Sequence, residues 1–207
     1  MSNTVNHQPA GPAVRTAATL AAIATIVTVV TQIAYVTVQG ETITAQLIWG
    51  TEVVAFAAVA LFGLAGALEA PAHRIGWSAL ALFGLFNTVQ AGMGLTMFGP
   101  LQEGGEALAG AFQAVLAGAF FFYFAGKVMV GIAALSFGLG AFRFGNAGAK
   151  TVGALAALSG IAALGTNLYG MVAGREGIVQ TAGATGTAAA LFVALAILLR
   201  PHATLDR

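Results

Sequence analysis

The sequence predicts an all-α integral membrane protein with six transmembrane helices, and three observations support this fold class. Of the 207 residues, 58% are apolar and 7% are charged, whereas about a quarter of a soluble domain is charged. The mean hydropathy is +0.89. The apolar runs are long and do not alternate, which favours membrane helices of about 20 residues over the strands of a membrane barrel.

Six apolar runs are long enough to cross the membrane. In chain order they cover Val14–Val38, Gln46–Leu68, Ile75–Phe98, Ala119–Ala141, Lys150–Val172 and Val179–Leu199. We therefore predict a cytoplasmic tail over residues 1–13, a single transmembrane helical bundle over residues 14–200 and a cytoplasmic tail over residues 201–207. The first run is longer than the core of a signal peptide, which has about 7–15 residues, and we expect it to remain as a helix.

The basic residues predict the orientation of these helices, because lysine and arginine accumulate at the cytoplasmic ends of short-looped spans. Six of them fall on the side that both chain ends share: Arg15, Arg74, Arg143, Lys150, Arg200 and Arg207. The opposite side has Arg175 and the acidic residues Glu41, Glu103, Glu106 and Glu176. Both termini are expected to be cytoplasmic, in a bacterial-type inner membrane or a plasma membrane.

Residues 107–142 do not fit a simple crossing. They are apolar almost without interruption, and a single helix at about 1.5 Å per residue would exceed the hydrocarbon core of about 30 Å. One arrangement breaks the helix near Gly118 and leaves an extra interfacial or re-entrant segment over residues 107–118 on the outer side. The other is a tilted, overlong helix that protrudes outward. The sequence favours neither.

The polar residues show a faint internal repeat. Three sets follow similar spacings: Arg15, Gln32 and Glu41; Lys150, Asn167 and Glu176; and, more loosely, Arg74, Gln90 and Glu103. One interpretation is three pseudo-repeated helical hairpins, which often place a binding site at their interface. The other is that every membrane hairpin begins with a basic residue inside and ends with an acidic residue outside.

Two charged residues lie inside the predicted spans. Glu52 and Lys127 are each about two turns from the outer end of their span, roughly 10 Å below the outer surface. A charged group at membrane depth costs at least ~2.5 kcal/mol, so such groups are normally paired, water-lined or functional. Their equal depth permits an intramembrane ion pair.

The uncharged polar residues of the spans also gather in the outer half, whereas the inner half is nearly all apolar. Four of them are amides: Gln32, Asn87, Gln90 and Asn167. Together with Glu52 and Lys127 they predict an outward-facing, ligand-binding pocket above an apolar plug. The alternative is that the amides join helices, at about 0.6 kcal/mol each. Tyr35, Trp49 and Tyr169 lie near span ends and are typical of an interfacial aromatic belt.

Glycines along the fourth and fifth spans predict close helix packing, in a compact bundle or at an oligomer seam. These glycines are Gly126, Gly131, Gly138, Gly140, Gly160, Gly165, Gly170 and Gly174.

The composition argues against several classes of function. There is no cysteine, which excludes a disulfide framework, a cysteine nucleophile and a thiolate metal site. His7, His73 and His202 lie in the predicted tails or a cytoplasmic loop, so no haem with axial histidines is expected. No nucleotide-binding motif is present, and a net charge of +1 does not suggest a nucleic-acid partner.

Three functions remain open. The chain either binds or transports a small ligand from the outer side through the pocket centred on Glu52 and Lys127, or is an accessory subunit of a larger membrane complex. In the second case, or in a homo-oligomer, Glu52 and Lys127 would be an assembly pair. An enzyme is the third class, but no nucleophile or metal constellation supports it. The remaining expected partner is the lipid bilayer.

Overall fold

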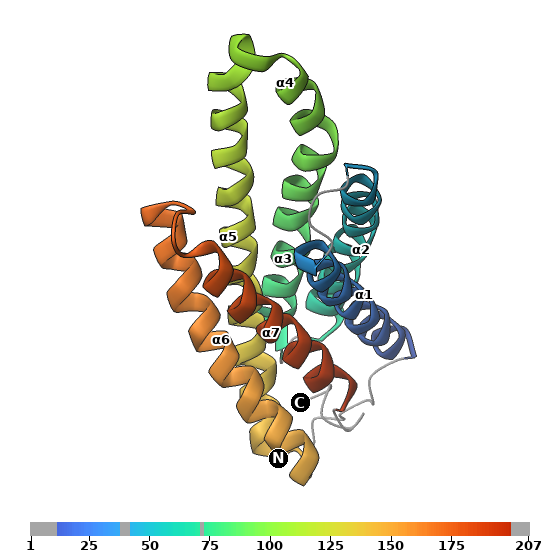
Figure 1. Cartoon of the computed structure of the whole chain (residues 1–207). Coiled ribbons are helices and arrows are strands. Elements are labelled where there is room, and N and C mark those ends of the chain that lie inside the picture. The colour runs from blue at the N-terminus through green and yellow to red at the C-terminus, as the bar shows by residue number, and fades with distance from the viewer. Residues whose placement is uncertain (1–11, 38–41, 71–72, 200–207) are drawn as a thin grey trace, which may run out of the picture.

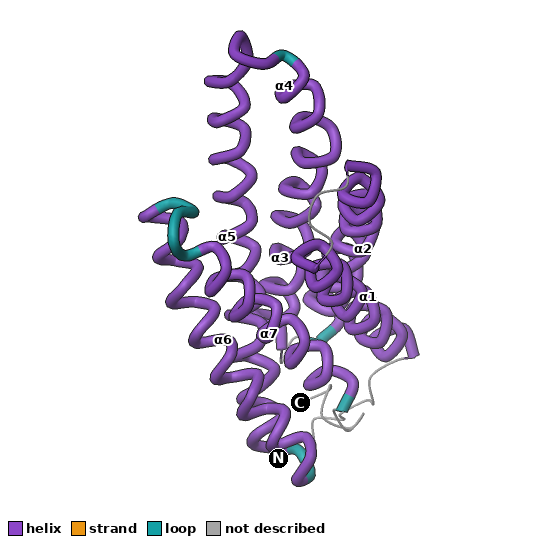
Figure 2. The backbone as a smooth tube through the Cα atoms, in the orientation of Figure 1, coloured by secondary structure: helices purple, strands orange, loops and turns teal. Residues whose placement is uncertain are grey.

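The computed structural model describes residues 12–37, 42–70 and 73–199, and the regular structure in these ranges is entirely helical (Figure 2). The elements are α1 Pro12–Thr37, α2 Thr42–Glu69, α3 Arg74–Met93, the π-helical turn η2 Gly94–Phe98, α4 Gly99–Glu103, α5 Gly105–Phe144, α6 Ala147–Ala173 and α7 Val179–Leu198. Six runs within these ranges are long and apolar enough to span a membrane, which confirms the predicted class. The predicted N-terminal tail was two residues too long, because Pro12 and Ala13 belong to α1. The rest of both predicted tails, with Val38, Glu41 and Arg200, lies outside the described residues.

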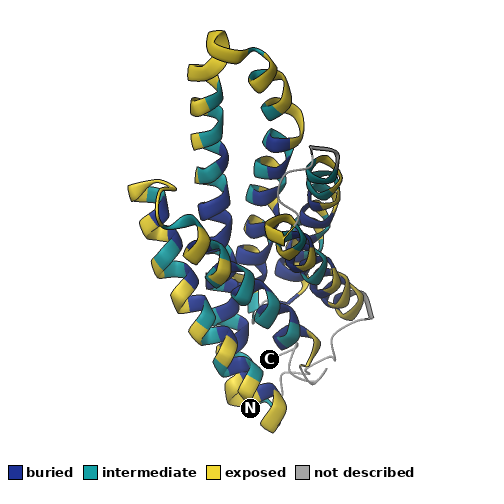
Figure 3. Cartoon of the chain, viewed as in Figure 1, coloured by how far each residue is buried: buried dark blue, intermediate teal, exposed yellow. Residues whose placement is uncertain are grey.

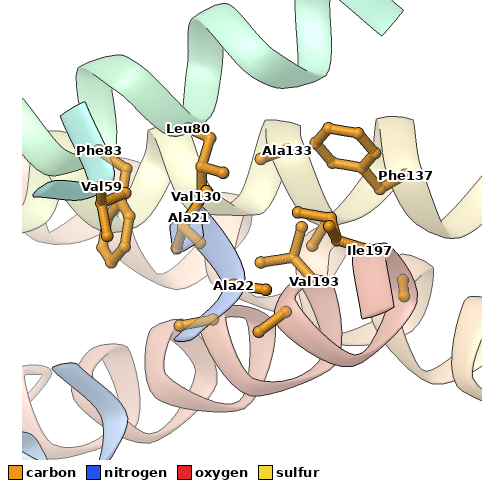
Figure 4. Close-up of a cluster of buried hydrophobic side chains, with 14 of the residues drawn as sticks. Ala21, Ala22, Val59, Leu80, Phe83, Val130, Ala133, Phe137, Val193 and Ile197 are labelled. Carbon is orange, nitrogen blue, oxygen red and sulfur yellow. The ribbon is translucent and has the colours of Figure 1, made fainter. Parts of the chain in front are cut away.

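Five helices form a closed ring around the core. Helices α1, α2, α3, α5 and α7 each pack against the next, α7 returns to α1, and α6 packs outside against α5 and α7. Apolar side chains from all five ring helices meet inside, among them Ala21, Val59, Leu80, Phe137 and Val193 (Figure 4). This packing buries apolar side chains from each helix of the ring.

The basic residues of the described ranges separate as the sequence predicts. The starts of α1, α3 and α6 and the ends of α2, α5 and α7 lie at one end of the bundle, which we call the base (Figure 1). Arg15, Arg74, Arg143 and Lys150 belong to helix ends at the base, and Arg175 follows α6 at the opposite end. The side of the membrane that the base faces remains a prediction.

The expected break near Gly118 is wrong, because α5 is one unbroken helix of 40 residues. At about 1.5 Å per residue it is roughly 60 Å long, twice the hydrocarbon core. A glycine inside a helix costs about 1 kcal/mol, and packing offsets this easily. No separate interfacial or re-entrant segment exists at residues 107–118, and the protruding alternative describes the structure.

The protruding part, which we call the arm, consists of η2, α4 and residues 105–118 of α5. It rises beyond α6 and α7 and is largely exposed (Figures 1 and 3). The π-helical turn precedes Pro100, which lacks the N–H needed for a regular helical hydrogen bond. Gly105, with a φ of 54°, then turns the chain back into α5. We call this end of the bundle, which also holds the α6–α7 turn, the arm end.

The glycines of α5 and α6 pack backbone against backbone. A Cβ atom added at Gly131 would lie 2.9 Å from the carbonyl oxygen of Gly160, and one at Gly138 would lie 2.7 Å from that of Gly153. The predicted close approach is therefore confirmed at Gly131, Gly138 and Gly160. Gly165 has no atom within 4 Å of such a Cβ, so it is not part of the seam.

The internal repeat remains a prediction. The successive pairs α1 with α2, α3 with α5, and α6 with α7 do pack together. However, the equivalent amides have different surroundings, because Asn167 is completely buried whereas Gln32 and Gln90 are half-buried.

Candidate ligand-binding site

Glu52 of α2 and Lys127 of α5 both lie inside the bundle. Their exposed fractions are 6% and 3%, and each acts on the other electrostatically. They do not form the predicted ion pair, because no contact within 4.0 Å joins them in the described structure. Two opposite charges are thus enclosed in the same interior without touching.

The surroundings of Lys127 explain why it does not reach Glu52. Its stem passes over Gly186 of α7, where an added Cβ would lie 2.8 Å from Lys127 Cγ. The ammonium nitrogen Nζ lies 5.3 Å from the ring centroid of Tyr123 and 6.0 Å from that of Phe83. The faces of aromatic rings attract cations, so these two rings are favourable neighbours for the ammonium group.

Glu52 faces hydroxyl-bearing side chains. The Thr31 side chain of α1 lies near it, and Tyr35 and Tyr123 are close enough to interact with it electrostatically. The Thr31 hydroxyl also donates to the backbone oxygen of Thr28 at 3.1 Å. Glu52 is therefore surrounded by neutral polar groups rather than by a cation in contact.

Asn87 of α3 lies beside this cluster. Its amide packs against Gly126 of α5, directly before Lys127, and donates to the backbone oxygen of Phe83 at 2.8 Å. Phe83 in turn contributes one of the rings near Lys127. Of the four predicted amides, Asn87 is the one that the structure connects most directly to the site.

The other three predicted amides are not connected to Glu52 or Lys127 by any described hydrogen bond. Asn167 donates to the backbone oxygens of Ala163 at 2.9 Å and Ala182 at 3.2 Å, so it joins α6 to α7. Gln32 and Gln90 are half-buried. A role of these three amides in ligand binding remains a prediction.

The sequence reasoning did not identify a row of buried threonines on α1. Thr25, Thr28 and Thr31 are 0%, 3% and 9% exposed and follow one another at intervals of three residues. This spacing places them on one helix face, which carries hydroxyl groups from Glu52 toward the middle of the bundle. The three-residue interval could have revealed this row from the sequence. In the same way, the four-residue interval from Tyr123 to Lys127 places those two residues on a common helix face.

Comparison with protein-family models, curated proteins and solved structures found no match to this chain. No group of three histidine, aspartate or glutamate side chains in the described ranges is arranged to hold a metal ion.

Two surface grooves lie elsewhere on the bundle. One, of about 520 Å³, lies between α5 and the end of α6, and the other, of about 650 Å³, lies along α1 and α2. Neither of these two grooves is lined by Glu52 or Lys127. One carboxyl group, one amine and the phenol group of Tyr123 lie inside the bundle, whereas Tyr35 is 42% exposed.

Proposed function

We propose that this chain is a multi-pass membrane protein that binds a small polar ligand between Glu52 and Lys127 and moves it or senses it from the arm end. The observation that carries the proposal is the burial of two opposite charges that do not contact each other. Each charge costs at least ~2.5 kcal/mol at membrane depth, and a structural role alone would favour a direct pair. A ligand that carries an ammonium and an acidic group would satisfy both charges.

Transport rather than binding alone would require a path toward the base. The threonine row Thr25, Thr28 and Thr31 supplies polar atoms in that direction, although each hydroxyl already donates to a carbonyl oxygen of its own helix. Beyond these threonines the core is apolar. Binding is therefore the better supported half of the proposal, and transport would require the ring helices to move.

The alternative is an accessory subunit in which Glu52 and Lys127 form contacts to another chain. Their burial inside this chain weighs against that role, because contact residues between subunits must reach the surface of each chain. The arm is exposed, however, and another protein chain could still bind there. Native mass spectrometry after gentle solubilisation tests this, because a stable stoichiometric partner would favour the subunit.

Co-purification of a small molecule tests the ligand proposal directly. The full chain and its Glu52→Gln and Lys127→Met variants would be purified in mild detergent, and the small molecules that they release would be compared by mass spectrometry. We expect a compound with both charges to be released from the unaltered chain and to fall about tenfold or more in each variant, since one lost charged hydrogen bond is worth about 1.5–3 kcal/mol.

Matched controls come from charged residues outside the site. Glu69→Gln and Lys150→Met alter exposed residues at the base and should leave the released compound unchanged. The proposal fails if all variants that remain folded release the same compounds in the same amounts.

A further inference from the structure

A groove of about 520 Å³ between α5 and the end of α6 combines apolar walls with a charged rim. Leu116, Phe120 and Phe121 of α5 form one wall, and the end of α6 forms the other. Phe121 is 50% exposed and the neighbouring Val172 is 91% exposed, so the groove opens onto the apolar surface of the bundle. Arg175 and Glu176 lie at its rim, in the turn between α6 and α7.

The groove lies where the lipid headgroups are expected to be. Helix α7 has 20 residues, which at about 1.5 Å each correspond to the thickness of the hydrocarbon core. The turn that precedes Val179 is therefore at the membrane interface. Because α5 continues past this turn into the arm, its side chains form a wall beside both the headgroups and the first part of the acyl chains.

The turn between α6 and α7 positions the two rim charges, and an aromatic ring also contacts one of them. Gly174 and Gly177 have φ angles of 83° and 72°, and these left-handed residues bracket the charged pair. The guanidinium carbon of Arg175 lies 5.3 Å from the ring centroid of Phe120, inside the groove. No ion pair with Arg175 is present among the described residues, so its planar donors are available to a phosphate group.

We propose that this groove binds a phospholipid whose headgroup carries both a phosphate and a primary ammonium, as in phosphatidylethanolamine. The phosphate contacts Arg175, the ammonium donates to Glu176, and an acyl chain lies along Leu116, Phe120 and Phe121. Phosphatidylglycerol presents no cation to Glu176, and the quaternary ammonium of phosphatidylcholine has no N–H to donate. Charge complementarity at the rim therefore disfavours phosphatidylglycerol, and the need for an N–H donor to Glu176 disfavours phosphatidylcholine.

Native mass spectrometry of the full chain in detergent tests the proposal, with equal amounts of phosphatidylethanolamine, phosphatidylglycerol and phosphatidylcholine added. We expect phosphatidylethanolamine to bind in preference to the other two. Arg175→Gln should lower its retention about tenfold, the effect of losing a hydrogen bond to a charged group. Glu176→Gln should abolish its advantage over phosphatidylcholine and raise the retention of phosphatidylglycerol.

Two controls separate a site from general lipid attraction. Arg143→Gln removes an exposed arginine at the base and should change nothing. Soluble phosphoethanolamine should compete poorly, because it lacks the acyl chain that the apolar wall contacts. Unchanged phosphatidylethanolamine retention in Arg175→Gln, equal retention of the three lipids by the unaltered chain, or full displacement by phosphoethanolamine would each overturn the proposal.

Discussion

Asn167 and Lys127 are both enclosed polar side chains, yet their neighbours give them different roles. The amide of Asn167 donates to backbone oxygens of α6 and α7, which is a contact between helices. The ammonium of Lys127 faces two aromatic rings and a carboxyl group that it does not touch. The amide nitrogen of Asn167 thus has a structural role, and its Oδ1 is buried with no hydrogen-bond partner among the described residues. Lys127, by contrast, is where we propose that a ligand binds.

Gly186 is predicted to act as a positioning residue for Lys127. In Gly186→Ala the new Cβ would lie 2.8 Å from Lys127 Cγ and 3.0 Å from its Cβ, so the lysine stem must shift. Overpacking of this kind costs about 1–3 kcal/mol, and we expect retention of the co-purified ligand to fall about tenfold. The measurement is the amount of released ligand per folded protein.

A double-mutant cycle distinguishes positioning from a general loss of stability. In a Lys127→Ala background the stem is absent, and Gly186→Ala should then cost little free energy of unfolding. Equal costs in both backgrounds would show that the alanine disturbs α7 itself rather than Lys127.

The sequence was sufficient to predict that Glu52 and Lys127 lie inside the bundle, because a charge within an apolar run is conspicuous. It was not sufficient to predict the partners of these residues. Thr25, Thr28 and Thr31 belong to the site or to the lipid surface depending on the rotation of α1, and rotation is decided by packing against α2 and α7. The path of the Lys127 stem likewise involves another helix, because the stem passes over Gly186 of α7.

At the scale of elements, the contact between α5 and α6 depends on facing glycines. The Cβ positions of Gly131 and Gly160 would each meet the carbonyl oxygen of the other, at 2.9 Å and 2.8 Å. Close backbone approach of this kind stabilises membrane helix pairs through van der Waals contact. It also holds α6, the helix outside the ring, against the helix that carries Lys127.

Alanine substitutions at two glycines of α6 should affect the free energy of unfolding differently. Gly160→Ala forces the α5 and α6 backbones apart and should lower the free energy of unfolding by about 1–3 kcal/mol. Gly165→Ala, with nothing within 4 Å of the new atom, should leave stability unchanged or raise it by up to about 1 kcal/mol through helix propensity. Unfolding titrations in detergent measure both, and equal effects would contradict the assigned seam.

Hydropathy predicts the bounds of some helices accurately but not the bounds of others. A membrane span was predicted over Val179–Leu199, and the helix α7 covers Val179–Leu198. The course of residues 107–118 was undecided, because hydropathy does not distinguish a helix that stops at the interface from one that continues. Contacts decide it: Gly118 packs against Met93, and the rings of Phe98 and Phe112 lie 5.7 Å apart.

At the scale of the whole molecule, the ring encloses the charged cluster and the arm extends beyond it. The sequence did not predict this ring, because the contacts of α7 with α1 and with α5 join segments that its local patterns do not relate. A chain of aromatic contacts, from Tyr35 to Trp49 at 5.9 Å and from Trp49 to Phe98 at 5.7 Å, connects α1 and α2 to the arm.

The absence of native cysteine allows a labelling test of the orientation and of the arm. Ala109→Cys, in the exposed arm, should react with a membrane-impermeant maleimide on intact cells. Ala147→Cys, exposed at the base, should react only after permeabilisation, and Leu139→Cys, on the apolar surface, should react in neither case. Labelling of Ala147→Cys on intact cells would show that the base faces outward, opposite to the predicted orientation.

An experimental density map of the full chain, purified in mild detergent without added ligand, is the sharpest test of ligand binding between Glu52 and Lys127. We expect non-protein density between these two residues, in contact with both side chains and absent from a Glu52→Gln map. A direct Glu52–Lys127 ion pair, with apolar side chains closed around it and no such density, would show that the two residues hold no ligand.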